Sequence, residues 1–73
     1  MTLADRLNQI IKEQGLTKTE FARRVGITKN YIMILTADTE RARKAKISNS
    51  LAKLISLEFG YDTDWILYGD KKD

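Results

Sequence analysis

The sequence contains no cysteine, no histidine and no proline, and the first two absences exclude whole classes of chemistry. Without cysteine the chain can form neither a disulfide nor a thiolate nucleophile, and without either residue most zinc sites are excluded. Histidine is also the usual general base at neutral pH. Because no nucleophile–base pair is left, we expect no enzyme activity, no metal site and no cofactor.

Long apolar segments are absent as well. No apolar run approaches the roughly 18 residues of a membrane helix, and the N-terminus lacks the basic-then-apolar pattern of a secretory signal. We therefore expect a cytoplasmic protein without a membrane partner. The 73 residues are enough for one domain, expected over residues 1–69 and followed by a flexible tail at 70–73. A chain this short buries only about 60% of its unfolded surface, so it needs an efficient core or a partner.

Basic residues are concentrated in the middle of the chain. The net charge of the whole sequence is only +3. Residues 17–46, however, hold eight basic and three acidic side chains, a net of +5, whereas residues 1–16 are balanced and residues 47–73 carry −2. A charge cluster is usually just a solvated face. Here it coincides with a segment that has reason to meet a polyanion.

That segment is LTKTEFARRVGITKNYIMIL, residues 16–35, which has the pattern of two short helices joined by a tight turn. Thr17 and Glu20 have the spacing of a capping box, and Thr28 is a good N-cap for the second helix. Gly26 suits the left-handed backbone that ends the first helix. The apolar side chains recur at helical spacing on an inner face, at Phe21, Ala22, Val25, Ile27, Ile32 and Leu35.

These spacings predict a helix-turn-helix. Ala22 lets the two backbones approach closely, Gly26 makes the corner, and Ile32 fills the angle between the helices. Taken alone, the segment also fits a helical corner in an unrelated small bundle.

We expect five helices and no strand, with helices near 3–14, 18–25, 29–36, 49–59 and 63–68. The first of them carries one apolar stripe, and the last two carry apolar rows that end at glycines. Outside the middle segment, the expected core residues are Leu3, Leu7, Ile10, Ile11, Ile55, Phe59 and Trp65.

The outward face of the helix at 29–36 is unusual because half of it is apolar. Asn30, Met33, Ile34 and Ala37 point outward, and Lys29 and Tyr31 flank them. Asn30 can pair bidentately with adenine, and Lys29 can reach guanine or a phosphate. Met33 and Ile34 make a poor solvent surface, so we expect them to contact a partner, and they can pack on thymine methyl groups.

Residues 36–47, TADTERARKAKI, leave three conformations open. The segment contains neither proline nor glycine, and its Ala, Arg, Lys and Glu favour helix. It can extend the preceding helix, form its own turn, or stay mobile. Its basic residues suit phosphate neutralisation, with a solvated basic loop as the alternative; they are Arg41, Arg43, Lys44 and Lys46.

The chain resembles the lambda-repressor-like, or Xre, family of bacterial and phage DNA-binding domains. Residues 16–35 are similar to the family's leucine-threonine-glutamine, alanine, glycine-valine-serine and isoleucine core. Residues 48–60, SNSLAKLISLEFG, match the following helix in length, and YDTDWILYG at 61–69 is similar to the family's aspartate-tryptophan-leucine-leucine close. The resemblance covers residues 2–69.

The resemblance implies an all-α, compact five-helix domain with its helix-turn-helix at the second and third helices. It also implies a sequence-specific regulator of transcription, a repressor of phage or mobile-element type that acts at the nucleoid. The helix at 29–36 would enter the major groove of double-stranded DNA.

The family's contacts can be carried over to matching positions. Lys18 stands where the family often has a glutamine that contacts the DNA backbone or a base. The face that the family uses for bases and adjacent phosphates corresponds to Thr28, Lys29, Asn30, Met33 and Ile34. Two features depart from the family pattern. Thr36 replaces a usual glutamate, and the connection to the next helix is about five residues longer and lacks its proline.

Similar family members bind palindromic operators as homodimers, which implies the same partner here. The last helix has surplus apolar surface, so we expect a dimer patch formed by Leu67 and Tyr68 together with Leu57 on the neighbouring helix. The alternative function is an antitoxin-like module whose main partner is another protein and whose DNA binding is secondary. The apolar Met33 and Ile34 favour that alternative.

Overall fold

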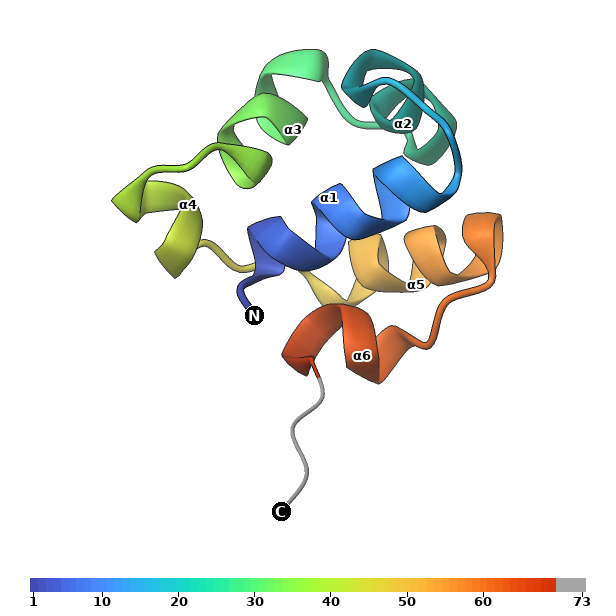
Figure 1. The fold of residues 1–73 in the computed structure, drawn as a ribbon. Coiled ribbons are helices and arrows are strands. Elements are labelled where there is room, and N and C mark those ends of the chain that lie inside the picture. Colours follow the sequence, from blue (N-terminus) through green and yellow to red (C-terminus); the bar gives the residue numbers. More distant parts are fainter. Residues whose placement is uncertain (70–73) are drawn as a thin grey trace.

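The computed structural model describes residues 1–69, which form six α-helices and no strand. The predicted tail at 70–73 lies outside the described residues. The helices follow one another along the chain as α1 (Leu3–Glu13), α2 (Lys18–Val25), α3 (Lys29–Thr36), α4 (Glu40–Lys44), α5 (Asn49–Phe59) and α6 (Thr63–Tyr68) (Figure 1). The prediction of an all-α fold is confirmed. Within the described part of the chain, no helix has the length and apolarity needed to cross a membrane.

The prediction of five helices is wrong, because residues 36–47 contain a further short helix. At Ala37 the backbone is extended, with ψ at 161°, so α3 cannot continue. Thr39 then caps α4, its Oγ1 accepting a hydrogen bond from the Ala42 amide at 3.1 Å. Ala42 is fully buried and anchors α4 on the rest of the molecule. Of the three conformations left open, the segment forms a separate helical turn.

Local capping sets the starts of α1 and α2. In α2 the Thr17 hydroxyl accepts from the Glu20 amide at 3.0 Å, and the Glu20 carboxylate accepts from the Thr17 amide at 2.8 Å. The same reciprocal pair links Thr2 and Asp5 at the start of α1. Gly26 ends α2 with φ at +80°, a left-handed conformation that costs a residue with a Cβ about 1 kcal/mol or more. The two helices and the turn predicted over 16–35 are thus present.

The core lies around α1, which packs on α3, α4 and α6. In Figure 1, α1 runs between the α2–α3 pair above and the α5–α6 pair below. Ile27, Phe59 and Trp65 were expected in the core but are only partly buried, since each lies at its edge. Ile66, next to Trp65, takes the inner position instead. The fully buried large side chains are Leu7, Ile10, Phe21, Ile32, Ile55 and Ile66.

Stacked aromatic rings join α2 to α5. The Phe21 and Phe59 rings lie 5.3 Å apart between centroids and are nearly parallel, at 9°. The guanidinium of Arg24 covers the Phe59 ring at 5.3 Å, and its Nε donates to the Glu58 carboxylate at 2.6 Å. This contact fixes the helix pair on the rest of the domain.

A buried arginine joins the two ends of the described chain. Arg6 lies on the inner side of α1 and is 5% exposed. Its guanidinium donates to the backbone carbonyls of Ile66 at 3.0 Å, Leu67 at 3.2 Å and Met1 at 3.0 Å. Two of these carbonyls belong to the last turn of α6, where a cation also interacts favourably with the helix dipole. Arg6 therefore holds α6 against α1.

Candidate nucleic-acid interface

The first turn of α3 is polar and exposed. Thr28 caps the helix, with its Oγ1 accepting from the Tyr31 amide at 3.0 Å. Ile32 and Leu35 are buried, which turns the opposite side of α3 outward. Lys29 and Asn30 are exposed on the first turn, as the helical spacing predicted. Their side chains are accessible to a partner.

The following turn of α3 is apolar and also exposed. Met33 is 44% exposed, and Tyr31 and Ile34 are each 38% exposed. Ala37, just beyond the helix, is half-buried. Apolar side chains of this size would be covered if the fold allowed it, so this face has the character of a contact surface.

Helix α4 adds basic residues beside this apolar face. A hollow of about 490 Å³ separates α3 from the start of the connection to α5. It is lined by Tyr31, Ile34, Leu35, Arg41, Lys44, Ala45 and Lys46. A second hollow of about 340 Å³ is lined by Met33, Ile34, Ala37, Thr39 and Arg41. Because Ile34 and Arg41 line both, the two hollows form one surface, which we call the α3–α4 face.

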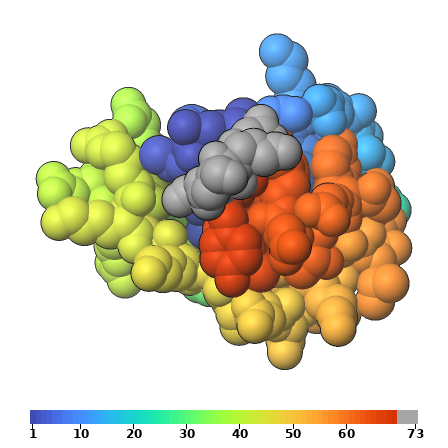
Figure 2. All heavy atoms as spheres, turned by 90° about the horizontal axis from the view of Figure 1, so that it is seen from below, coloured from blue at the N-terminus to red at the C-terminus, as the bar shows by residue number. Residues whose placement is uncertain are grey.

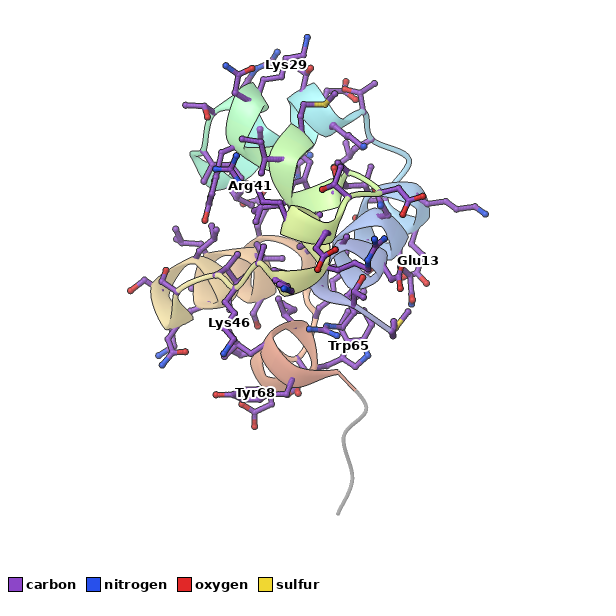
Figure 3. All side chains as sticks on the ribbon, turned by 90° about the vertical axis from the view of Figure 1, so that its left-hand side faces the viewer. Glu13, Lys29, Arg41, Lys46, Trp65 and Tyr68 are labelled. Carbon is purple, nitrogen blue, oxygen red and sulfur yellow. The ribbon has the colours of Figure 1, made fainter. Side chains whose placement is uncertain are left out.

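Three of the basic residues predicted to contact DNA lie along this side of the molecule. In Figure 3, Lys29 lies at the top, where α3 begins, Arg41 lies between it and Lys46, and Lys46 lies beside α5. Glu13 lies toward the opposite side. Within the described part of the chain, none of the three cations forms an ion pair, so their charge is available to a partner.

Other predicted cations are placed differently. Arg43 pairs with Asp38 at 3.1 Å and lines a hollow beside the start of α1 with Thr2 and Asn8. Lys44 pairs with Glu40 at 3.2 Å, one turn back on α4. Lys18 is half-buried as the first residue of α2 and lines neither hollow of the α3–α4 face. Of these three cations only Lys44 lines a hollow of the α3–α4 face, so the predicted cations do not gather at one point.

Thr36, noted in the sequence only because it replaces the family's usual glutamate, has a structural role at the end of α3. It is buried, and its Oγ1 donates to the Ile32 carbonyl at 2.7 Å. Its own carbonyl accepts from Nδ2 of Asn8 on α1, at 3.2 Å. These bonds fix the end of α3 on α1 and so set the direction of the helix. The signal was its spacing of four from Ile32, at which a threonine hydroxyl can bond back to the helix.

The three residues predicted for a dimer patch do not lie together in one chain. Leu67 is half-buried, and with Tyr68 and Asn49 it lines a hollow of about 520 Å³ at the start of α5. Leu57 lies near the other end of α5, which spans Asn49–Phe59. Because α5 and α6 run in opposite directions (Figure 1), that end of α5 is remote from the end of α6 that carries Tyr68. Leu57 is 79% exposed and Tyr68 is 62% exposed, so both are accessible to a partner. Figure 2 shows α6 exposed on the lower side of the molecule.

The remaining chemistry of the surface is sparse. Among residues 1–69, no group of three or more His, Cys, Asp or Glu could hold a metal ion.

No family model, no curated protein and no solved structure matches the chain. The function is therefore inferred from the residues of the α3–α4 face and from the resemblance in the sequence.

Proposed function

We propose that this protein is a sequence-specific, double-stranded DNA-binding regulator of transcription, with α3 as its recognition helix. The observation that carries the proposal is the exposed outer face of α3 beside three cations that form no ion pair within residues 1–69. The major groove is wide enough to admit an α-helix. Phosphate contacts then hold the helix in register while base contacts read the sequence.

The roles divide along the helix. Asn30, in the first turn, has the donor and acceptor that pair bidentately with adenine. Lys29 reaches a guanine or a neighbouring phosphate. Arg41 and Lys46 neutralise phosphates beside the groove, which gives affinity without sequence preference. The combination fits a lambda-repressor-like domain acting as a repressor of phage or mobile-element type, without catalysis.

The regulator is proposed to act as a homodimer on a palindromic operator. In a two-fold contact, a residue of one copy meets a different residue of the other, and the reverse contact is made as well. Leu57 of one copy can therefore pack against Leu67 and Tyr68 of its partner, although these residues are apart in one chain. A contact this small is weak and becomes complete on DNA.

One observation favours a second candidate, an antitoxin-like module that binds a protein. Met33 and Ile34 are exposed beside a hollow with mainly apolar walls, and such surfaces also bind peptides. Arg41, which lines this hollow, and Lys46, which lines the neighbouring one, favour DNA, since an apolar peptide offers them no opposite charge.

Selection of duplexes from a random pool, followed by binding at several salt concentrations, tests the proposal. We expect Asn30→Ala to weaken binding of the selected duplex by about 1–3 kcal/mol and to relax the preference at one base pair. Lys46→Ala should weaken binding of all duplexes and reduce the slope of log K against log salt by about 0.9. We choose Lys46 rather than Lys44 for this substitution because Lys44 is already paired with Glu40.

Lys12→Ala is the matched control, because it removes one exposed charge beside Glu13, away from the α3–α4 face. It should leave the salt slope close to that of the wild type. If the wild-type protein enriches no duplex and binds none in low salt, the DNA-binding proposal is wrong. If Lys46→Ala changes base preference while Asn30→Ala does not, the division between base and phosphate contacts is wrong.

A further inference from the structure

A hollow between the start of α1, the end of α6 and the connection from α4 to α5 is separate from the α3–α4 face. We call it the α4–α6 hollow. Among residues 1–69, its lining has only Ala45 and Lys46 in common with that face. Figure 2 shows the connection (yellow) beside α6 (red). The volume of about 520 Å³ lies within the range of roughly 300–1,000 Å³ that small-molecule sites have.

The walls of the α4–α6 hollow are mainly apolar. Leu3 is buried in its floor, and Ile47 and Leu67 are half-buried. Tyr68 also lines it and is 62% exposed, so its ring stands at the opening. Such walls suit the apolar or aromatic body of a small molecule, because its burial removes apolar surface from water on both sides.

The charge of the α4–α6 hollow has one sign. Arg43 and Lys46 line it, and no Asp or Glu among residues 1–69 does so. Arg43 pairs with Asp38, but the two side chains are 54% and 100% exposed, and an ion pair so exposed to water is weak. Within the described part of the chain, Lys46 forms no ion pair. Arg6 is already bound to backbone carbonyls, so the two exposed cations are the ones that a ligand can engage.

We propose that the α4–α6 hollow binds a small carboxylate with an apolar or aromatic body, and that this ligand opposes DNA binding. The planar guanidinium of Arg43 matches a carboxylate bidentately, and Lys46 adds a second charge. The body of the ligand packs between Ile47, Leu67 and Tyr68. An inorganic anion would leave these walls unfilled, and a neutral apolar molecule would leave the cations without a partner.

The effect on DNA follows from residues that the hollow shares with the proposed contacts. Lys46 is proposed to neutralise a DNA phosphate, and a bound carboxylate competes for the same ammonium group. Leu67 and Tyr68 are proposed to form the dimer contact, and the body of the ligand covers them. This regulatory step rests on the proposed function, whereas binding of the ligand to the hollow does not.

The first experiment uses the protein without DNA and follows its backbone amides by NMR during titration with 2-naphthoate. We expect saturable shifts at the amides of Ala45, Ile47 and Tyr68, which surround the hollow. The comparison compound is 2-naphthamide, which has the same ring system without the charge. It should bind about tenfold more weakly, because it cannot form charge-assisted hydrogen bonds.

Matched variants distinguish the two surfaces. Arg43→Gln should weaken naphthoate binding by about tenfold, and Tyr68→Ala should weaken it as well. Arg41→Gln and Tyr31→Ala remove the same residue types from the α3–α4 face and should bind naphthoate as the wild type does. All four positions are exposed, and circular dichroism checks that the variants fold.

The second experiment measures binding to the duplex that the wild type selects from a random pool. With naphthoate at saturation, the wild type should bind this duplex about as weakly as Lys46→Ala does without it. Cooperative filling of two half-sites should be lost as well. Arg43→Gln should need about tenfold more naphthoate for the same weakening of its own DNA affinity.

The outcomes separate the ligand site from the regulatory step. Absence of the amide shifts, equal binding of naphthamide, or a larger loss in Arg41→Gln than in Arg43→Gln would overturn the ligand site. Unchanged DNA affinity at saturating naphthoate would overturn the regulatory step and leave the proposed function in place. Naphthoate binding by a protein that selects no duplex would support the ligand site and overturn both the proposed function and the regulatory step.

Discussion

At the scale of single residues, Arg6 does most to connect distant parts of the chain. The three hydrogen bonds described above end on backbone carbonyls at both ends of the described residues. Gly69 is part of the same arrangement, with φ at +79° and an ideal Cβ that would lie 2.9 Å from Nη1 of Arg6. The arginine head is held in place by its hydrogen bonds, so it cannot move away cheaply. Both residues are therefore expected to tolerate substitution poorly.

Arg6→Met should lower the free energy of unfolding by about 2–4 kcal/mol, because it leaves carbonyls of α6 without their donor. Arg6→Lys should recover little of this loss, since an ammonium cannot reproduce the planar fork of donors. Urea denaturation measures both effects. Arg23→Met, at an exposed position of α2, is the control and should change stability by much less. Equal midpoints for Arg6→Met and Arg23→Met would show that the three hydrogen bonds do not stabilise the fold.

The role of Arg6 could not be predicted from the sequence, although its position could. It lies three residues after Leu3 and four before Ile10, which places it on the inner face of α1. A charged residue there can equally extend its head to solvent, as long basic side chains commonly do. Two of the carbonyls that keep the guanidinium inside belong to residues 60 and 61 positions away, so no local pattern could identify them.

At the scale of elements, the local signals predicted α1, α2 and α3 well because their boundaries depend on neighbours in sequence. The Thr17 and Thr28 hydroxyls accept from amides three residues later, and the Gly26 amide donates to carbonyls three and four residues earlier. Helix α4 was left open because its composition favours helix everywhere between 36 and 47. Its actual extent depends on the burial of Ala42 against other helices, which composition does not encode.

The capping box of α2 predicts how the stability of the fold depends on pH. The hydrogen bond from the Thr17 amide, aided by the Thr17 hydroxyl, lowers the pKa of Glu20 below its usual 4.5. A carboxylate with a lower pKa in the folded state stabilises the fold above the unfolded pKa and loses this contribution as pH falls through the folded pKa. The melting temperature of the wild type should therefore decrease as the pH is lowered below about 4.5.

Glu20→Gln keeps an acceptor for the Thr17 amide but cannot titrate, so its melting temperature should fall less steeply over that range. Asp5, in the capping box of α1, has a pKa lowered by the Thr2 amide in the same way. The Asp5→Asn/Glu20→Gln variant should accordingly show the flattest dependence. Thermal melts between pH 2.5 and 6 compare the three proteins. A slope in Glu20→Gln as steep as in the wild type would mean that the acid sensitivity arises at other carboxylates.

At the scale of the whole molecule, the proposed DNA contacts and the proposed dimer contacts lie on different elements. The DNA contacts come from α3 and α4, and the dimer contacts come from α5 and α6. The described domain measures 35 × 28 × 21 Å along its principal axes. Two copies side by side can therefore place their recognition helices about 34–36 Å apart, the spacing of one DNA turn. The size of the domain suits the geometry that a palindromic operator requires.

A dimer is proposed because one recognition helix would contact too few base pairs to select an operator among the competing sites of a genome. Tyr68→Asp and Leu57→Asp each place a charge in the proposed two-fold contact, and each contact occurs twice because of the symmetry. We expect both variants to fill two half-sites independently, whereas the wild type fills them cooperatively. Both substituted side chains are well exposed in the single chain, so the monomers should stay folded. Footprinting on a palindromic duplex, together with sedimentation, measures the change. Loss of cooperativity in only one variant would mean that Leu57 does not meet Tyr68 of the partner, and unchanged cooperativity in both would place the dimer contact elsewhere.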